Sequence, residues 1–279
     1  MHSNSTIAPA RAPRPVTPHT ILSSEIEKLL DRMETVGADP EWTAALARCR
    51  TLAAPLEDYL LRCSTQPSAE LERLEAATRE LDWDAAYERG ETGVRLEQEM
   101  VSGSLEGQFL KMLVAISGAK NILEVGSFTG YASLAMAEAL PPDGHLLACE
   151  MDPFAAAFAE RHLRETEAGR KVEIRVGPAG DTIAALATTA RTFDLVFIDA
   201  DKQGYLGYFQ QLLDHELVPV GGLLCIDNTL YQGQVYAGNI PTENGRALDH
   251  FNKSVAADDR VEQVMLPLRD GVTLIRRVR

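Results

Sequence analysis

From residue 120 onward, short apolar segments of strand length alternate with segments in which apolar side chains recur at helical spacing. The strand-like segments are 121–126, 145–150, 171–177, 193–200 and 221–228. The helix-like segments are 130–140, 153–166, 179–190, 205–215 and 244–257. This strict alternation predicts a parallel sheet with helices on both faces, an α/β fold of the Rossmann-like type.

The C-terminal segment departs from the alternation. "VEQVMLPLRDGVTLIRRV" holds two strand-like runs on either side of Asp270 and Gly271, a dipeptide typical of hairpin turns. We therefore expect a seven-stranded, mostly parallel sheet that closes with an antiparallel hairpin at its edge.

The chain before residue 115 shows helical spacing and no convincing strand. One helix is expected around Ile21 to Met33, a second after Asp39 and Pro40 with a break near Pro55, and a third from Ser68. Their apolar stripes indicate core or subunit packing. The first 18 residues, rich in proline, serine and alanine, read as a flexible tail. The expected organisation is a tail over 1–18, a helical extension over 19–95 and an α/β domain over 96–279.

Composition narrows the classes of function. The 41 acidic and 27 basic residues give a net charge of −14, which argues against nonspecific binding to nucleic acid or to an anionic membrane. No apolar run reaches membrane-spanning length, and the N-terminus lacks the apolar core of a signal peptide. The four cysteines show no CxxC spacing, so reduced thiols in a cytoplasmic protein are expected.

Polar residues gather where the predicted strands end, which is where an open α/β sheet binds its ligands. The first strand runs into "EVGSFTGYAS", in which Gly126 and Gly130 permit close approach of a ligand. The dinucleotide pattern GxGxxG is absent. Glu150 ends the second strand, where a carboxylate can accept both ribose hydroxyls of a nucleoside. S-adenosylmethionine, a nucleoside with a small tail, fits this arrangement; a tight turn with an exposed glutamate is the alternative.

The fourth and fifth strands end in a second polar group. Asp199, Asp227 and Asn228 form an all-oxygen set suited to a hard cation such as Mg²⁺. Lys202 follows closely and could act as a general base if the site lowers its pKa. The alternatives are helix capping and turn roles for the trio, and a solvated surface position for the lysine.

Three motifs carry a resemblance to a known family. In order, "ILEVGSFTGYASLAMAEALP", "LVFIDADKQGY" and "LCIDNTLYQGQV" resemble the cation-dependent class I O-methyltransferases of the caffeoyl-coenzyme A and catechol group, over about residues 97–279. The resemblance implies a Rossmann-like class I methyltransferase fold and a homodimer. Two cofactors are implied, S-adenosylmethionine and a divalent cation, which is expected to be Mg²⁺. It also implies that "LEQEMVSGSLEGQFLKML" folds over the methyl donor.

The family pattern implies a role for each matching residue. Lys202 would deprotonate the acceptor, and Asp199, Asp227 and Asn228 would hold the metal. Glu150 would hold the ribose, and Ala179 would contact the adenine through its backbone. The other residues expected around the donor are Ser102, Glu124, Gly126, Ser127, Tyr131, Ser133, Asp199 and Asp201. One position departs from the pattern, because Ala132 stands where the family usually has serine.

The N-terminal "RPVTPHTIL", the helical preface and "LPLRDGVTLIRRV" are most similar to the O-methyltransferases of mycosporine-like amino acid biosynthesis. That similarity implies a small cyclic enol acceptor, demethyl-4-deoxygadusol, methylated to 4-deoxygadusol. A catechol or caffeoyl-type phenolic acceptor is the close alternative, and Leu230, Tyr231 and the segment 232–236 are expected to shape the acceptor pocket. A nicotinamide-dependent oxidoreductase is disfavoured by the missing glycine and the acidic trio. A catalytically inactive donor-binding protein is disfavoured by the complete metal set with Lys202.

Overall fold

The computed structural model describes residues 14–238 and 240–279. Most of the expected tail lies outside these residues. The part of it that is described, residues 14–18, is not free: the backbone N–H of Arg14 donates to Glu99, and Thr17 is buried as the N-cap of the first helix, which begins at Pro18. Thr17 and Thr20 form a capping box, so the turn that starts this helix is well satisfied.

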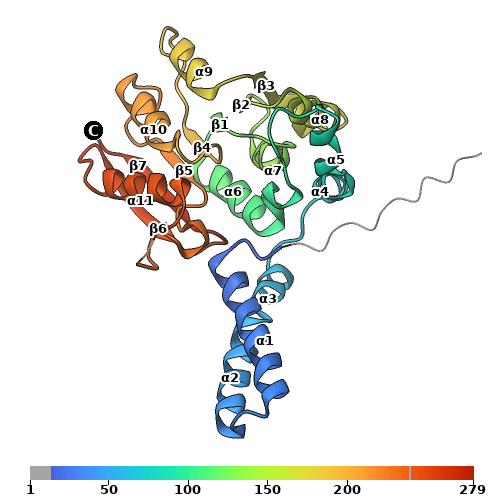
Figure 1. The fold of residues 1–279 in the computed structure, drawn as a ribbon. Helices are drawn as coiled ribbons and strands as arrows, with labels where there is room; N and C mark the ends of the chain where they lie inside the picture. Colours follow the sequence, from blue (N-terminus) through green and yellow to red (C-terminus); the bar gives the residue numbers. More distant parts are fainter. Residues whose placement is uncertain (1–13, 239) are drawn as a thin grey trace, which may run out of the picture.

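One seven-stranded sheet organises the rest of the chain (Figure 1). The strand order is β3-β2-β1-β4-β5-β7-β6. The strands are β1 Asn121–Val125, β2 His145–Glu150, β3 Val172–Val176, β4 Leu195–Ile198, β5 Leu223–Ile226, β6 Val261–Leu266 and β7 Val272–Arg277. The first five strands are parallel, and β7 pairs antiparallel with both β5 and β6. The fold predicted from the sequence is confirmed, including the C-terminal hairpin.

Helices cover both faces of the sheet because strand residues alternate between two apolar layers. Leu123 and Val125 of β1 pack with α9 Ala179–Leu186, α10 Tyr205–Asp214 and α11 Glu243–Ala256. Ile122 points to the opposite layer, with α6 Gly103–Ser117 and α7 Tyr131–Ala139. On that side, α8 Pro153–Arg164 packs against α7. Glu124 shares the alternation of Ile122, so a carboxylate enters an otherwise apolar layer beside α7.

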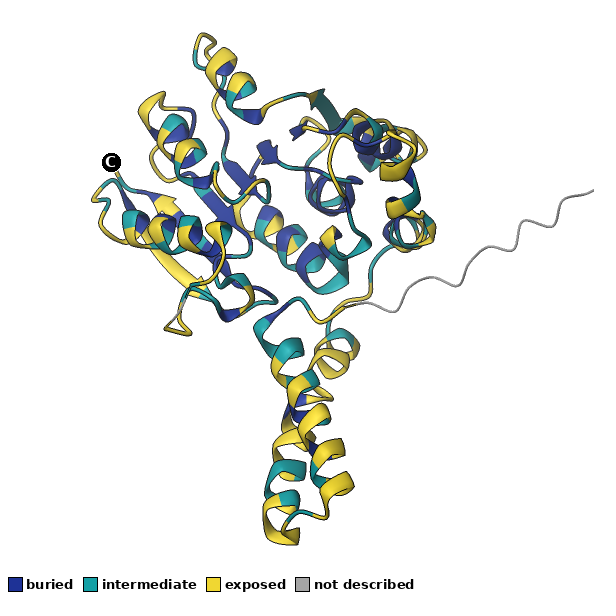
Figure 2. Ribbon diagram, viewed as in Figure 1, coloured by how far each residue is buried: buried dark blue, intermediate teal, exposed yellow. Residues whose placement is uncertain are grey.

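The N-terminal helices form two groups. α1 Pro18–Val36, α2 Pro40–Ala53 and α3 Leu56–Cys63 make a stalk that extends away from the sheet (Figure 1). Figure 2 shows that most of its surface is exposed; the core between α1 and α2 contains Ile26, Leu30 and Ala53. α4 Ala69–Glu80 begins at the expected cap Ser68, and it packs on α7. The expected break near Pro55 separates α2 from α3.

Two details differ from the expected elements. α9 ends at Leu186 and not at 190, because the hydroxyls of Thr188 and Thr189 donate to the carbonyls of Ala185 and Leu186 and compete with helix continuation. The short α5 Trp83–Glu88 was not expected, since six residues carry too little periodicity. The short helical turns are η1 Gln98–Met100, η2 Ala168–Lys171 and η3 Tyr231–Gly233. Among the helices of the described residues, none is long and apolar enough to cross a membrane.

Candidate active site

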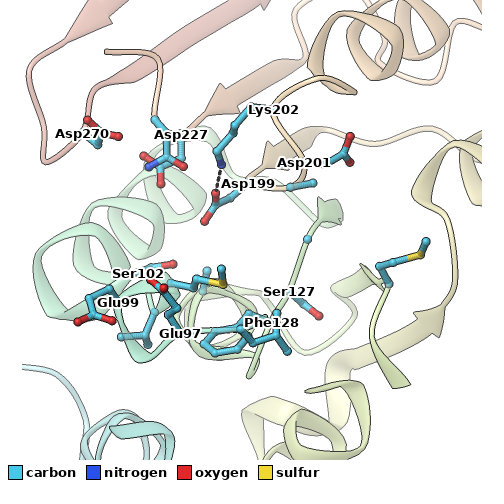
Figure 3. A pocket seen from close by; sticks show the side chains of 18 of the residues that line it. Glu97, Glu99, Ser102, Ser127, Phe128, Asp199, Asp201, Lys202, Asp227 and Asp270 are labelled. Carbon is cyan, nitrogen blue, oxygen red and sulfur yellow. Dashed lines mark hydrogen bonds and ion pairs between the residues drawn. The ribbon is translucent and has the colours of Figure 1, made fainter. Parts of the chain in front are cut away.

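A cavity of about 970 Å³ opens at the carboxyl ends of β1, β2, β4 and β5. Its opposite wall is the segment from Val94 to Ser102, which leads into α6. In Figure 3, Glu97, Glu99 and Ser102 on this wall lie across from Asp199, Lys202 and Asp227 at the strand ends. The sheet edge predicted from the sequence therefore lines one shared cavity.

The cavity brings together almost every residue singled out in the sequence. The predicted residues that line it are Ser102, Glu124, Gly126, Ser127, Tyr131, Glu150, Ala179, Asp199, Asp201, Lys202, Asp227 and Asn228. Of the residues expected to shape the acceptor pocket, Tyr231 and Gln232 line the cavity, whereas Leu230 and residues 233–236 do not. Among the residues expected to contact the donor or the metal, the exception is Ser133. It is fully buried, and its hydroxyl donates to the carboxylate of Glu124. Ser133 therefore holds a cavity residue in place and does not itself line the cavity.

The backbone of the loop between β1 and α7 lies against the backbone of Asp199 and Ala200, just after β4. Gly126 has φ +91°, and a Cβ built on it would lie 2.1 Å from the carbonyl oxygen of Asp199. Only glycine meets both demands. The loop is supported from outside, because Thr78 of α4 donates to the hydroxyl of Thr129 over 3.0 Å. The loop over residues 126–130, called the donor loop below, is thus held against the end of β4.

Two buried carboxylates line the cavity, Glu124 in β1 and Glu150 at the end of β2. Burial raises the pKa of Glu124 to about 8, and its Oε1 has no hydrogen-bond partner among the described residues. Glu150 accepts from the backbone N–H of Phe128 over 2.6 Å and of Asp152 over 2.9 Å, and burial raises its pKa. Both groups have acceptor capacity left for a ligand. Ala132, at the departure from the family pattern, also lines the cavity and is nearly fully buried.

The candidate metal ligands follow two hydrogen-bonded strands. Ile198 pairs with Ile226, so Asp199 and Asp227 leave the sheet side by side, and Asn228 follows with φ 59°. Burial and the nearby Asp199 charge raise the pKa of Asp227 to about 7, and its Oδ1 is buried without a partner. A buried acceptor of this kind is costly unless a cation or a donor satisfies it. The oxygen set therefore fits a hard divalent cation.

The set contains only two carboxylates. Within residues 14–238 and 240–279, no group of three or more His, Cys, Asp or Glu side chains has the arrangement of a metal site. The third oxygen of the candidate set is the amide of Asn228, which such a group does not include. A site with two protein carboxylates leaves positions for water and for substrate oxygens.

Lys202 lies at the centre of this group. Its Nζ donates to Asp199 Oδ1 over 2.8 Å (Figure 3). It also donates to the hydroxyl of Tyr205 over 2.7 Å. Burial acts to lower its pKa, but the negative charges of Asp199 and Asp227 and the nearby Tyr205 outweigh burial and raise it. In the protein without a cation, the pKa of Lys202 is therefore raised; the lowering was expected beside a bound cation and stays a prediction. The close pairing of Lys202 with Asp199 and Tyr205 was not predicted from the sequence.

Other cavity residues were not predicted from the sequence. Arg269 and Asp270 come from the β6–β7 turn, and Glu106 comes from α6. The "RDG" segment was interpreted as a turn signal and as part of the similarity of "LPLRDGVTLIRRV". Glu106 was interpreted only as part of the segment 96–113 that is expected to fold over the methyl donor. Asp201, in contrast, was predicted; it accepts from the hydroxyl of Tyr208 over 2.5 Å at the outer part of the site.

A doubly wound sheet of this order, with a glycine turn after β1, an acidic end of β2 and a cavity over both, defines a class I S-adenosylmethionine-dependent methyltransferase. The comparison with protein families is specific: residues 86–278 match the family described as O-methyltransferase. The chain belongs to this family, and it is an S-adenosylmethionine-dependent O-methyltransferase.

Curated relatives and solved structures agree. The chain is 39% identical over 188 residues to caffeoyl-CoA O-methyltransferase of Petroselinum crispum, covering 64% of this chain and 77% of the relative. It is 42% identical over 189 residues to caffeoyl-CoA O-methyltransferase 1 of Zea mays, covering 64% and 72%. The SAH-bound methyltransferase PaMTH1 of Podospora anserina superposes with a TM-score of 0.71 at 27% identity, covering 82% of this chain and 96% of that one. An O-methyltransferase of Bacillus cereus in complex with SAH gives 0.68 at 26% identity, covering 80% and 96%.

Proposed function

We propose that the protein transfers a methyl group to a hydroxyl of a small cyclic acceptor held by a divalent cation, and that this cation is Mg²⁺. The observation that carries this proposal is the buried, unpartnered Oδ1 of Asp227 beside Asp199 and Lys202, in the same cavity as the donor loop. Asp199, Asp227 and Asn228 would hold the cation.

The donor side is assigned to the residues on the other half of the cavity. Glu150 would accept from the ribose hydroxyls, and Ala179 would contact the adenine through its backbone. The free Oε1 of Glu124 suits a cationic ammonium group, which the methionine part of the donor carries. Ser102, at the start of α6, would cover this part from the opposite wall. The remaining donor contacts are assigned to Gly126, Ser127, Tyr131, Asp199 and Asp201.

We assign to Lys202 the role of the general base that removes the proton of the acceptor hydroxyl. A bound divalent cation would offset the carboxylate charges, lower the pKa of the acceptor hydroxyl and orient its oxygen. Once the carboxylate charges that raise the pKa of Lys202 are offset, its side chain could be a neutral amine, and its Nζ would accept the hydroxyl proton. The oxygen would then form a bond to the methyl carbon. The electron pair of the breaking carbon–sulfur bond stays on sulfur. The products are the methyl ether, S-adenosylhomocysteine and one proton, so charge and atoms balance. Much of the acceleration would come from positioning the two reactants.

The acceptor that we propose is demethyl-4-deoxygadusol, which would become 4-deoxygadusol. Its support is the sequence similarity that includes the N-terminal preface and the "LPLRDGVTLIRRV" segment. Phenolic acceptors of the catechol or caffeoyl type are the alternative, favoured by the names of the curated relatives. Both acceptor types present neighbouring oxygens that can chelate one cation. Tyr231, Gln232 and Asn244 line the cavity and would contact the acceptor.

The test is a transfer assay with purified protein, S-adenosylmethionine and MgCl₂. Parallel reactions contain demethyl-4-deoxygadusol, catechol or caffeoyl-CoA, each with and without EDTA, and mass spectrometry detects the added methyl group. Methylation of the cyclohexenone alone, lost in EDTA, supports the whole proposal. Methylation of the phenols alone keeps the reaction and replaces the acceptor. Undiminished transfer in EDTA would refute the cation.

Two further proposals concern organisation. Residues 19–95 would form a helical extension to a methyltransferase domain over 96–279, close to the family match that starts at residue 86. A homodimer is supported by apolar side chains on the stalk, where Trp42, Leu52 and Tyr59 are each more than half exposed. Light scattering of the purified chain measures its mass in solution and decides between monomer and dimer.

A further inference from the structure

Arg269 occupies an unusual place in the cavity. It lies in the turn between β6 and β7, and its side chain enters the cavity that Asp199 and Asp227 also line. The side chain is 22% exposed. The other arginines that line the cavity, Arg14 and Arg95, are 46% and 65% exposed and pair with surface carboxylates. Arg269 is therefore the guanidinium placed deepest, on the side of the candidate metal ligands.

Only one of the three nitrogen atoms of the Arg269 guanidinium donates hydrogen bonds to the described residues. Its recorded hydrogen bonds both come from Nη1, one to Glu106 Oε2 over 3.2 Å and one to the carbonyl of Val101 over 3.3 Å. Charge-assisted bonds between a guanidinium and a carboxylate are usually 2.7–2.9 Å long and often bidentate. Nε and Nη2 have no hydrogen-bond partner among the described residues. Neither atom is among the fully buried side-chain atoms that lack a partner. Nε and Nη2 are therefore not fully buried, and they belong to a residue that lines the cavity.

The backbone at Arg269 also carries a cost. Its φ is +48°, in the left-handed region that side chains other than glycine seldom adopt. A turn requires no guanidinium, and glycine would fit this conformation without strain. A strained residue that projects a cation into a ligand cavity is a reason to look for a function in that side chain.

The proposed acceptor class supplies a matching group. An enol conjugated to a ketone is a vinylogous acid, so a ring with three contiguous oxygens on such a system is an anion at neutral pH. Two neighbouring oxygens can chelate a cation, and the third keeps part of the enolate charge. Catechol has two oxygens and no equivalent of the third. A guanidinium beside the metal ligands can distinguish these two acceptors by a charge-assisted bond.

We infer that Arg269 is a specificity-determining residue that binds the third, anionic oxygen of a cyclic enolate acceptor through Nε and Nη2. The inference rests on the proposed function, because it places the acceptor at the cation held by Asp199, Asp227 and Asn228. It identifies the substrate class as an ionised cyclic enol and not a neutral phenol.

The experiment measures binding, so that it does not depend on methyl transfer. Reductic acid, a five-membered cyclic enol with three contiguous oxygens, and catechol are titrated by calorimetry into protein that contains MgCl₂ and S-adenosylhomocysteine. Wild type, Arg269→Gln and Arg276→Gln are compared. Arg276 belongs to the same hairpin but pairs with Glu262 on the surface. Loss of one charge-assisted bond corresponds to about a 10- to 100-fold loss of affinity.

We expect Arg269→Gln to weaken the binding of reductic acid by that factor relative to the binding of catechol. Arg276→Gln should leave the ratio of the two affinities unchanged. An equal loss for both ligands, an unchanged ratio, or a wild type that does not prefer reductic acid would overturn the inference. The double variant Glu106→Gln with Arg269→Gln tests a merely structural role: restored selectivity would show that Arg269 only neutralises Glu106. The proposed function fails separately, if wild type methylates no acceptor while the Arg269-dependent binding persists.

Discussion

Replacing Asp227 by asparagine should make the protein more stable and less active at the same time. The carboxylate is buried, one of its oxygens has no partner, and its pKa is raised from 3.8 to about 7 by burial and by the charge of Asp199. Asparagine keeps the shape and removes the charge. In the protein without a cation, the substitution therefore removes the repulsion between the carboxylates of Asp199 and Asp227, which destabilises the folded state.

The size of the effect follows from the pKa. A difference of roughly three pKa units at about 1.4 kcal/mol each gives about 4 kcal/mol as the upper limit. The backbone N–H of Asn228 bonds less strongly to an amide oxygen than to a carboxylate, which reduces the gain, so about 2–4 kcal/mol is expected at pH 8. Because the folded-state pKa lies above the unfolded value, the unfolded chain loses its proton first, and wild-type stability falls as pH rises from about 4 to about 7. Asp227→Asn lacks this decline.

Urea unfolding in EDTA, followed through the fluorescence of the buried Trp83, measures the difference at pH 4 and at pH 8. A second series adds MgCl₂, which should stabilise the wild type but not Asp227→Asn, because a ligand that binds only the folded state stabilises it. Asp143→Asn, at an exposed ion pair with Lys120, is the control and should keep the Mg²⁺ response. The reasoning is refuted if Asp227→Asn is less stable than wild type at pH 8 in EDTA, or if MgCl₂ stabilises both equally.

Three further substitutions test other parts of the site. Lys202→Met should lower kcat by about 10²- to 10⁴-fold in a single-turnover assay, as for loss of a general base, and a loss below tenfold would contradict the assigned role. Gly126→Ala should abolish S-adenosylhomocysteine binding and lower the Tm, because its Cβ would lie 2.1 Å from Asp199 O, whereas Gly207→Ala, with open space around it, should do neither. Ala132→Ser should tighten S-adenosylhomocysteine by about two- to tenfold in calorimetry, the value of one added hydrogen bond, and unchanged affinity would show that the missing serine is not needed.

The sequence predicted the sheet and most of the cavity for one physical reason. Parallel strands in a β-α alternation place their carboxyl ends at one edge, so Glu150, Asp199 and Asp227 had to meet there once the strands were correctly located. The period of the apolar residues located the strands, and the register of β4 with β5 confirmed the neighbours.

What escaped prediction depends on side-chain direction and on contacts between distant segments. Ser133 follows Ala132 on α7, and a rotation of one helical position turns its hydroxyl from the cavity toward Glu124. The raised pKa of Lys202 depends on Tyr205 and Asp227, whose distances no spacing rule provides. Arg269 reaches the site through a turn 163 residues after Glu106, and a turn signal says nothing about where its side chain points.

The position of β7 has a consequence for how the site is assembled during synthesis. β7 is the last strand in the chain, yet it lies inside the sheet and forms the ladder with β5, where Ile226 pairs with Thr273 just before Asp227. Until residues 272–277 have left the ribosome, β5 has an open edge and the end that carries Asp227 and Asn228 lacks its neighbour. The donor loop after β1 can fold earlier, against β2 and β4. A nascent chain should therefore form the part of the cavity around the loop after β1 before the part around Asp227 and Asn228.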